Sequence, residues 1–258
     1  MELHYDVHEG TGPYMLLVHG FLSGRSQWQP NLAALSRVVR PVVVELWGHG
    51  RSPSPEEPER YYPDGYVTLF EDLRQHLGAE RWVLCGQSLG AALTMRYVLT
   101  QPSRVLAQVF TNSSATFADA AWLQARRSSA LQQAETIERD GHPALEALRV
   151  HPVHARRLPQ EAQAALVADA RLHTPRGIAN TLRYTTPNAP VRERVHTLQT
   201  PTLLVCGERE QRFHDYRTFA ERTIPGLEVT GTPAGHAVNI EAAEAFNTAV
   251  VDFIGRYT

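Results

Sequence analysis

Residues Gly86–Gly90 read GQSLG and lie between an apolar run, Trp82–Cys85, and a run of mostly small and apolar residues, Ala91–Tyr97. The apolar run is typical of a buried strand, and the run after it favours a helix. A strand, a G-x-S-x-G motif and a helix in this order predict a sharp turn that presents Ser88 as a nucleophile. Glycine on both sides of the turn removes Cβ atoms for which there is little room.

Further strand-like runs recur along the chain, and helical stretches separate them. Most are continuously apolar, which favours strands buried on both faces of a parallel sheet. The segment Glu2–Glu9 alternates instead and predicts an antiparallel edge strand. The predicted central strands are Tyr14–Val18, Pro41–Leu46, Trp82–Cys85, Leu106–Phe110, Thr202–Cys206 and Leu227–Thr230.

Residues 115–198 interrupt this rhythm and contain no strand-like run. Prolines divide the segment into four predicted helices, Ala118–Arg139, Pro143–Val150, Pro159–Arg171 and Arg176–Tyr184. We therefore predict an α/β core formed by residues 1–114 and 199–258, with residues 115–198 inserted as a helical cap. The cap is mildly basic, for which a solvated helical surface is the usual explanation. The alternative is a lid that favours an anionic substrate.

Length and composition exclude several classes of protein. The chain has 258 residues, enough for one large domain, and a formal net charge of -2, which argues against a nucleic-acid partner. Cys85 and Cys206 each end an apolar run, so we expect both to be buried and reduced. No glycine-rich phosphate loop and no metal-ligand spacing is present, so we expect no cofactor and no metal.

The N-terminal residues Met1–Asp6 lack the basic start and apolar stretch of a signal peptide. No apolar run approaches the roughly 18 residues that would span a membrane. We expect a cytoplasmic protein, a monomer or homodimer, with no membrane association and a small acyl compound as its substrate.

A serine nucleophile needs a base, and His236 is the candidate among 12 histidines. It follows the last predicted strand and precedes the C-terminal helix Ala242–Tyr257, and open α/β sheets place active sites at such strand ends. The acid that orients the base is predicted to be Glu210, which follows the strand Thr202–Cys206. Glu208 and Asp215 are the rivals in that loop.

An oxyanion hole completes this chemistry. Its predicted donors are the backbone N–H groups of Leu89, next to the nucleophile, and of Phe21, which follows the His19-Gly20 pair after the first central strand. Gly20 would allow the backbone to come close to a substrate. Position along the chain also predicts a set of residues that contact the substrate: His19, Gly20, Leu22, Trp47, Gln87, Phe117, Trp122 and Val238.

Together these motifs resemble the α/β-hydrolase family of the alpha/beta hydrolase-1 type. The matching segments run in the family's order of serine, acid and histidine, and they are Leu17–Phe21, Gly48–Ser52, Gly86–Gly90, Gly207–Glu210 and Gly235-His236. The resemblance implies the core sheet, a cap after the sixth strand and the roles given above. Two positions depart from the family, which usually has Asp where Glu210 stands and Asp-x-x-Gly where Glu45–Gly48 stands.

The family includes several activities. A serine nucleophile excludes the aspartate-dependent dehalogenases. The 2-succinyl-6-hydroxy-2,4-cyclohexadiene-1-carboxylate synthases share this layout but typically carry arginine four residues after the serine, where this chain has Ala92. Hydrolysis of carboxylic esters through an acyl-enzyme is the prediction. A thioesterase, a C–C bond hydrolase and a hydrolase-like ligand-binding signalling protein are the alternatives.

Overall fold

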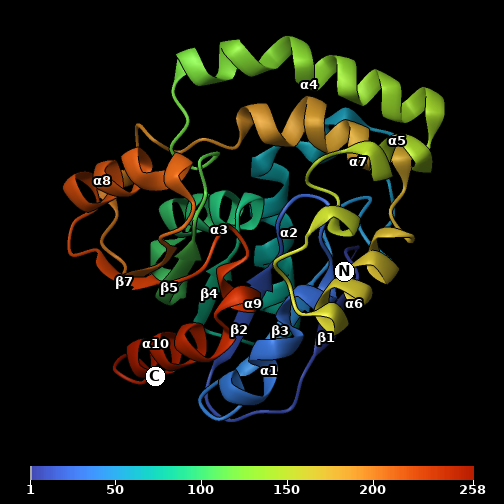
Figure 1. The fold of residues 1–258 in the computed structure, drawn as a ribbon. Coiled ribbons are helices and arrows are strands. Elements are labelled where there is room, and N and C mark those ends of the chain that lie inside the picture. The colour runs from blue at the N-terminus through green and yellow to red at the C-terminus, as the bar shows by residue number, and fades with distance from the viewer. Residues whose placement is uncertain (1) are drawn as a thin grey trace.

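A mostly parallel sheet of seven strands forms the centre of the molecule in the computed structural model, which describes residues 2–258 (Figure 1). The order is β1-β3-β2-β4-β5-β6-β7, and among these strands only β1 runs antiparallel, against β3. The strands are β1 (Tyr5–Val7), β2 (Tyr14–Val18), β3 (Arg40–Val44), β4 (Trp82–Gly86), β5 (Val105–Thr111), β6 (Thr202–Gly207) and β7 (Glu228–Thr232). The predicted edge strand and parallel sheet are confirmed, with β1 shorter than the segment Glu2–Glu9.

Helices cover both faces of this sheet. On one face lie α2 (Pro63–His76), α3 (Leu89–Thr100) and α8 (His214–Thr223), and on the other lie α1 (Gln29–Leu35) and α10 (Ala243–Ile254), which follows the single turn α9 (Val238–Glu241). Shorter 3₁₀ turns join the elements at Arg25–Trp28, Pro58–Tyr61, Pro102–Arg104, Pro152–His154, Thr186–Asn188, Val195–Thr197 and Gln211–Phe213.

The core has two layers because successive residues of each strand point to opposite faces of the sheet. In β2, Leu16 and Val18 pack toward α2 and α3, whereas Met15 and Leu17 pack toward α1 and α10. Burial on both faces explains why the strands are continuously apolar in sequence. Cys85 is buried on the α1 and α10 side, and both cysteines are free thiols.

The segment between β5 and β6 is helical and lies over one end of the core (Figure 1). Its helices are α4 (Ala120–Asp140), α5 (His142–Ala147), α6 (Gln160–Ala170) and α7 (Pro175–Asn180), which continues into a π-helical turn, Thr181–Thr185. This segment is called the cap below. It follows the fifth strand, not the sixth as the resemblance implied, because only one strand, β1, precedes β2.

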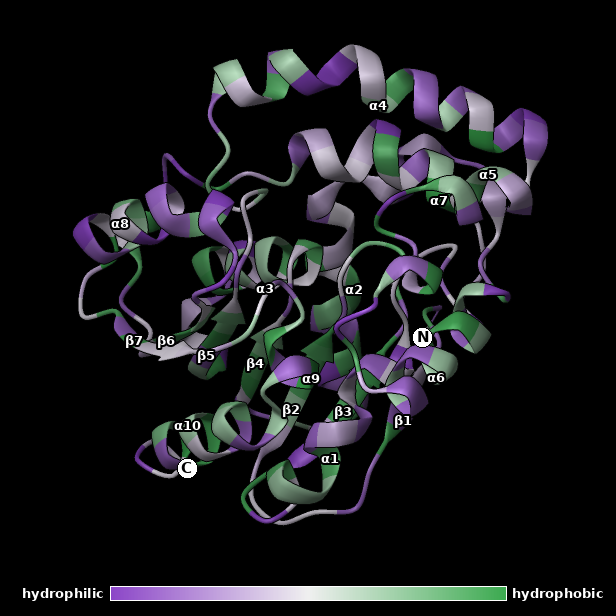
Figure 2. Ribbon diagram, viewed as in Figure 1, coloured by the Kyte–Doolittle hydropathy of each residue, from purple (hydrophilic) through white to green (hydrophobic). Residues whose placement is uncertain are grey.

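A small hydrophobic cluster of its own holds the cap together. Ile137 of α4 and Leu145 of α5 pack with Ile178 of α7, and Leu22 from the core reaches the same cluster. Hydrophilic residues occupy much of the remaining surface of α4 (Figure 2). The cap is therefore a thin amphipathic layer, and its apolar side faces the core of the protein.

Candidate active site

Ser88 occupies a strained turn between β4 and α3. Its backbone has φ +52° and ψ −114°, a conformation that residues other than glycine rarely adopt. A Cβ atom at Gly90 would overlap the carbonyl oxygen of Val18, so the predicted need for glycine is physical. The hydroxyl of Ser113 donates to the carbonyl oxygen of Ser88 at 2.6 Å, which helps hold the turn in place.

His236 lies on the loop between β7 and α9, and its ring faces Glu210 from the loop after β6. The Nδ1 atom is 3.0 Å from Oε1 and 2.9 Å from Oε2 of Glu210, so Nδ1–H donates to the carboxylate and leaves Nε2 free. The side-chain amide of Gln87 donates to the carbonyl oxygen of His236 at 3.1 Å. The residue before the nucleophile thus also fixes the loop that carries the imidazole.

The two rival acids point elsewhere. Glu208 is exposed and lies 3.5 Å from Arg217, while Asp215 is exposed in the first turn of α8. Neither makes a hydrogen bond to His236 within the described residues, 2–258. Only Glu210 of the three carboxylates is brought to the imidazole.

Asn112 is a site residue that the sequence analysis missed. Its side-chain amide donates to Oε2 of Glu210 and to the carbonyl oxygen of Gly207, both at 2.9 Å, and its Oδ1 accepts from the N–H of Gly207 at 3.0 Å. Burial raises the pKa of Glu210, but the hydrogen bond and charge of His236 and the amide of Asn112 outweigh burial and hold that pKa below its usual value. Glu210 is therefore ionised near neutral pH.

The loop after β2 approaches the nucleophile closely. A Cβ atom at Gly20 would overlap Oε1 of Gln87 and lie 3.1 Å from Cβ of Ser88. The N–H of Gly20 donates to Oε1 of Gln27 at 3.3 Å, which ties down the loop. Across the described residues, the N–H groups of Phe21 and Leu89 make no hydrogen bond, so both are free to receive a ligand oxygen.

One cavity of about 610 Å³ contains Ser88, His236 and Glu210. Phe21, Leu22, Gln27 and Gln87 line its core side. The cap side comes from one stretch, residues 149–158 with the exception of Val153, together with Leu166 of α6. Such a volume suits a small organic molecule enclosed on several sides.

Of the eight residues predicted to contact a substrate, only Leu22 and Gln87 line this cavity. Trp47, Phe117 and Val238 do not line it, and each is fully buried in the hydrophobic core. His19 and Gly20 are not lining residues either. Both ring nitrogens of His19 are engaged, with the carbonyl oxygen of Gly20 at 2.7 Å and the N–H of Leu46 at 3.1 Å.

Trp122 is not a lining residue of the cavity either. It lies in the first turn of α4, away from the cavity, and the guanidinium of Arg126 stacks over its ring at 4.4 Å. Trp122 precedes Arg126 by one helical turn, so the two side chains contact each other along the surface of α4. The cap contributes to the cavity through the connection between α5 and α6 and not through α4.

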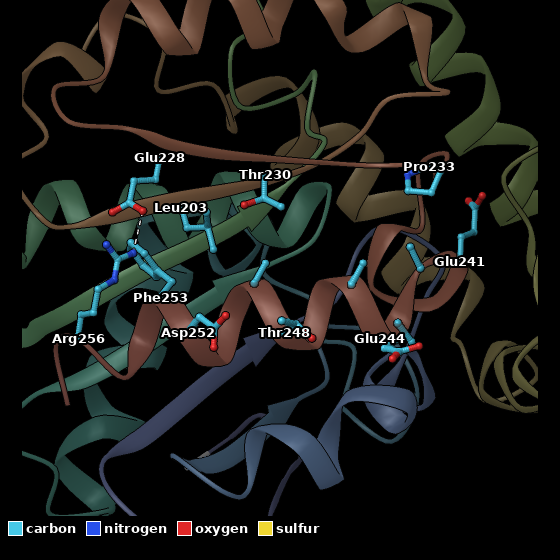
Figure 3. A pocket seen from close by; sticks show the side chains of 14 residues that line it. Leu203, Glu228, Thr230, Pro233, Glu241, Glu244, Thr248, Asp252, Phe253 and Arg256 are labelled. Carbon is cyan, nitrogen blue, oxygen red and sulfur yellow. Dashed lines mark hydrogen bonds and ion pairs between the residues drawn. The ribbon is translucent and has the colours of Figure 1, made fainter.

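A larger depression, of about 1160 Å³, lies on the outside of the sheet between β7 and α10 (Figure 3). Four carboxylates line it, from Glu228, Glu241, Glu244 and Asp252. Its one lining cation, Arg256, is paired with Glu228 at 2.7 Å. No nucleophile and base meet there, so the smaller cavity is the candidate active site.

Two kinds of feature are absent from residues 2–258. No cluster of three or more histidine, cysteine, aspartate or glutamate side chains is arranged to hold a metal ion. No helix in the same range has both the length and the apolar character needed to cross a membrane.

Comparison with known proteins agrees with this architecture. The sequence model of a family described as the alpha/beta hydrolase fold matches residues 13–243. A Bacillus subtilis protein, named provisionally as a 2-succinyl-6-hydroxy-2,4-cyclohexadiene-1-carboxylate synthase, is 24% identical over 248 residues, covering 93% of this chain and 89% of that protein. Carboxylesterase YbfK of Bacillus subtilis is 27% identical over 255 residues, covering 94% and 80%.

Solved structures share the fold at low sequence identity. MenH from S. aureus superposes with a TM-score of 0.86 at 20% identity, and covers 98% of both chains. The enol-lactonase from Burkholderia xenovorans LB400 superposes with a TM-score of 0.84 at 22% identity, covering 98% of this chain and 96% of its own. The sheet order, the strained serine turn and the match over most of the sequence lead to one conclusion: the chain belongs to the α/β-hydrolase family.

Proposed function

We propose that the chain is a serine hydrolase that cleaves carboxylic esters through an acyl-enzyme. The observation that carries the proposal is the contact of about 3 Å between His236 Nδ1 and both carboxylate oxygens of Glu210, in the cavity that also contains the strained Ser88. Carboxylesterases among the relatives support the ester as the bond that is cleaved.

The mechanism follows from these positions. Ser88 Oγ attacks the acyl carbon while His236 Nε2 takes its proton, and Glu210 stabilises the imidazolium through Nδ1–H. The negative charge on the tetrahedral oxygen is received by the free N–H groups of Phe21 and Leu89. His236 then returns the proton to the leaving alcohol. A water molecule then attacks the acyl-enzyme by the same steps, with His236 as the base, and this releases the acid and restores Ser88.

The synthase activity named for one relative is the weaker candidate. The resemblance to those synthases implies arginine four residues after the serine, and Ala92 at that position is fully buried in the core. A buried alanine offers no charge to a substrate carboxylate, so this position supports a different specificity.

The proposal is tested with a fluorophosphonate probe, which forms a stable adduct with an activated serine. We expect intact mass spectrometry to show one adduct on the wild-type protein and none on Ser88→Ala. Ser129→Ala is the matched control, because Ser129 is an exposed serine of α4 outside the cavity, and this variant should keep the adduct. An adduct that persists in folded Ser88→Ala, or none on the folded wild type, would refute the proposal.

A further inference from the structure

The stretch of the cap that covers Ser88, residues 149–158, is rich in positive charge. Arg149, Arg156 and Arg157 all line the cavity. None of the three side chains makes an ion pair or a hydrogen bond with another described residue, although ten other arginines of the chain form ion pairs. Three unpaired guanidinium groups at one cavity are a strong local source of positive potential.

The acidic residues of the cavity do not balance these charges. Glu210 is engaged by His236 and Asn112. Glu241 accepts from the N–H of Gly235 at 2.8 Å and from the N–H of Ala237 at 3.3 Å. Hydrogen bonds from backbone N–H groups leave the charge of Glu241 in place, and its carboxylate oxygens lie 3.0 and 3.1 Å from the Cβ position of Gly235. The cavity therefore has two carboxylates against three arginines, which leaves an excess of positive charge.

Arg157 is the best placed of the three arginines. A Cβ atom built on Gly235, the neighbour of His236, would lie 3.0 Å from Nη1 of Arg157. This places the guanidinium beside the loop that carries the imidazole, although Arg157 belongs to the cap. Arg157 is exposed and lines the same cavity as Ser88, so its guanidinium is open to a ligand in that cavity.

Of the two histidines of the stretch, His151 is buried and His154 is exposed. His151 is buried, and burial lowers the pKa of its ring, so it is neutral near pH 7. His154 uses Nε2 in a hydrogen bond of 2.8 Å with the carbonyl oxygen of Glu146. The rest of the lining is largely apolar, and includes Phe21, Leu158 and Ile240.

From this arrangement we propose that the substrate is an ester with a second, free anionic group, which the cap arginines bind while an apolar segment lies between that group and the scissile bond. Guanidinium groups match carboxylate and phosphate oxygens through paired hydrogen bonds. The proposal rests on the serine hydrolase function above and names the class of substrate for the same site.

The test uses two esters that differ only in charge. The 4-nitrophenyl monoester of adipic acid and 4-nitrophenyl hexanoate have acyl chains of equal length, and only the first ends in a carboxylate. We expect kcat/KM to be higher for the adipate ester, after subtraction of its spontaneous hydrolysis. Arg157→Gln should lower the ratio of the adipate to the hexanoate kcat/KM by about ten-fold or more.

Arg127→Gln is the matched control, because Arg127 is an exposed arginine of the cap that lies on α4 and does not line the cavity. It should leave the ratio of the two kcat/KM values unchanged. Arg149→Gln and Arg156→Gln then show how much each of these arginines contributes to the ratio. The triple variant, with all three arginines replaced by glutamine, shows whether one arginine compensates for the loss of another. Equal kcat/KM values for the two esters in the wild type, or an unchanged ratio in the triple variant, would overturn the proposal.

Two additions separate the possible outcomes. Adipate and inorganic phosphate are compared as competitive inhibitors of hexanoate hydrolysis, and the stronger inhibitor identifies the anion that the arginines prefer. Inhibition by neither overturns the proposal. Turnover of the hexanoate ester without a charge preference removes this inference alone, whereas no turnover and no fluorophosphonate adduct removes the hydrolase function as well.

Discussion

At the scale of one residue, Asn112 holds the carboxylate of Glu210 in its orientation toward His236. It follows directly from β5 and joins two loops, because one amide contacts both the carboxylate of Glu210 and the backbone of Gly207. Glutamate has a longer side chain than the aspartate usual at this position and needs more restraint to keep one orientation. We interpret Asn112 as a positioning residue that supplies this restraint.

Replacing Asn112 with alanine is therefore expected to lower kcat about ten-fold or more, because Glu210 loses a partner that fixes it and lowers its pKa. The pKa of Glu210 should rise, so activity should be lost at a higher pH on acidification than in the wild type. The pH profile of kcat/KM measures this shift. Asn188→Ala, which removes an exposed amide that donates to Tyr184, is the control. An acid limb at the same pH in both variants would contradict the positioning role.

The cap and the core meet through a few specific contacts at the scale of elements. Asp169, near the end of α6, is buried and its Oδ2 accepts from the N–H of Ser26 at 2.8 Å. A Cβ atom at Gly24 would lie 2.9 Å from Cβ of Asp169, so only glycine allows this approach. A short distance along the chain, His173 accepts from the N–H of Gly50 at 2.9 Å. These two contacts fix the cap at the end of α6 and just after it, on the C-terminal side of residues 149–158.

Loss of the first contact should loosen α6. Asp169→Ala leaves the N–H of Ser26 without a partner, which costs about 1–3 kcal/mol of unfolding free energy. Asp169→Asn keeps an acceptor oxygen and should cost less. Urea denaturation measures the loss, and hydrogen exchange should show faster exchange at residues 24–28 and 160–170 in the alanine variant alone. Equal stability of the two variants would show that the hydrogen bond is not what fastens the cap.

Three buried histidines connect the cap to the core at the scale of the whole molecule. His19, His49 and His173 lie in a row with ring centroids 5.1 Å apart at each step, and the rings meet tilted (His19 and His49) or edge-to-face (His49 and His173). Each accepts a backbone N–H, from Leu46, Leu22 and Gly50 respectively. A proton on the accepting nitrogen would turn each bond into a clash of two donors.

Burial lowers the pKa of all three rings, and that of His173 falls from 6.5 to about 3. The carboxylates of Glu45 and Asp169 act in the opposite direction on His19 but do not outweigh burial. Below pH 6.5 these three histidines bind protons in the unfolded chain but stay neutral in the folded chain. Stability is therefore complete above that pH and declines as pH falls, by about 1 kcal/mol per pH unit for each histidine.

His173→Gln should make the pH dependence of the unfolding free energy less steep by about 1 kcal/mol per pH unit between pH 6 and pH 4. The variant removes one titrating ring and keeps an acceptor for the N–H of Gly50. Denaturant unfolding at several pH values gives the slope, and His196→Gln, at an exposed histidine, is the control. Parallel curves for His173→Gln and the wild type would contradict this account.

The sequence predicted the sheet and the positions of Ser88, Glu210 and His236 because these depend on local order along the chain. Strand ends of a parallel sheet meet at one edge, so residues directly after strands can be assigned from sequence. Asn112 satisfied the same rule and was overlooked. Trp47 and Phe117 failed because an aromatic residue near a loop packs into the core as readily as into a pocket. Arg157 could not be located, because its place depends on how Asp169 docks the cap.

The cap side of the cavity comes almost entirely from nine of the ten residues 149–158, with only Leu166 outside this stretch. None of these ten residues belongs to the sheet or to the loops that carry Ser88, Glu210 and His236. A replacement confined to this stretch would therefore change one wall of the cavity and leave Ser88, Glu210 and His236 on unaltered loops.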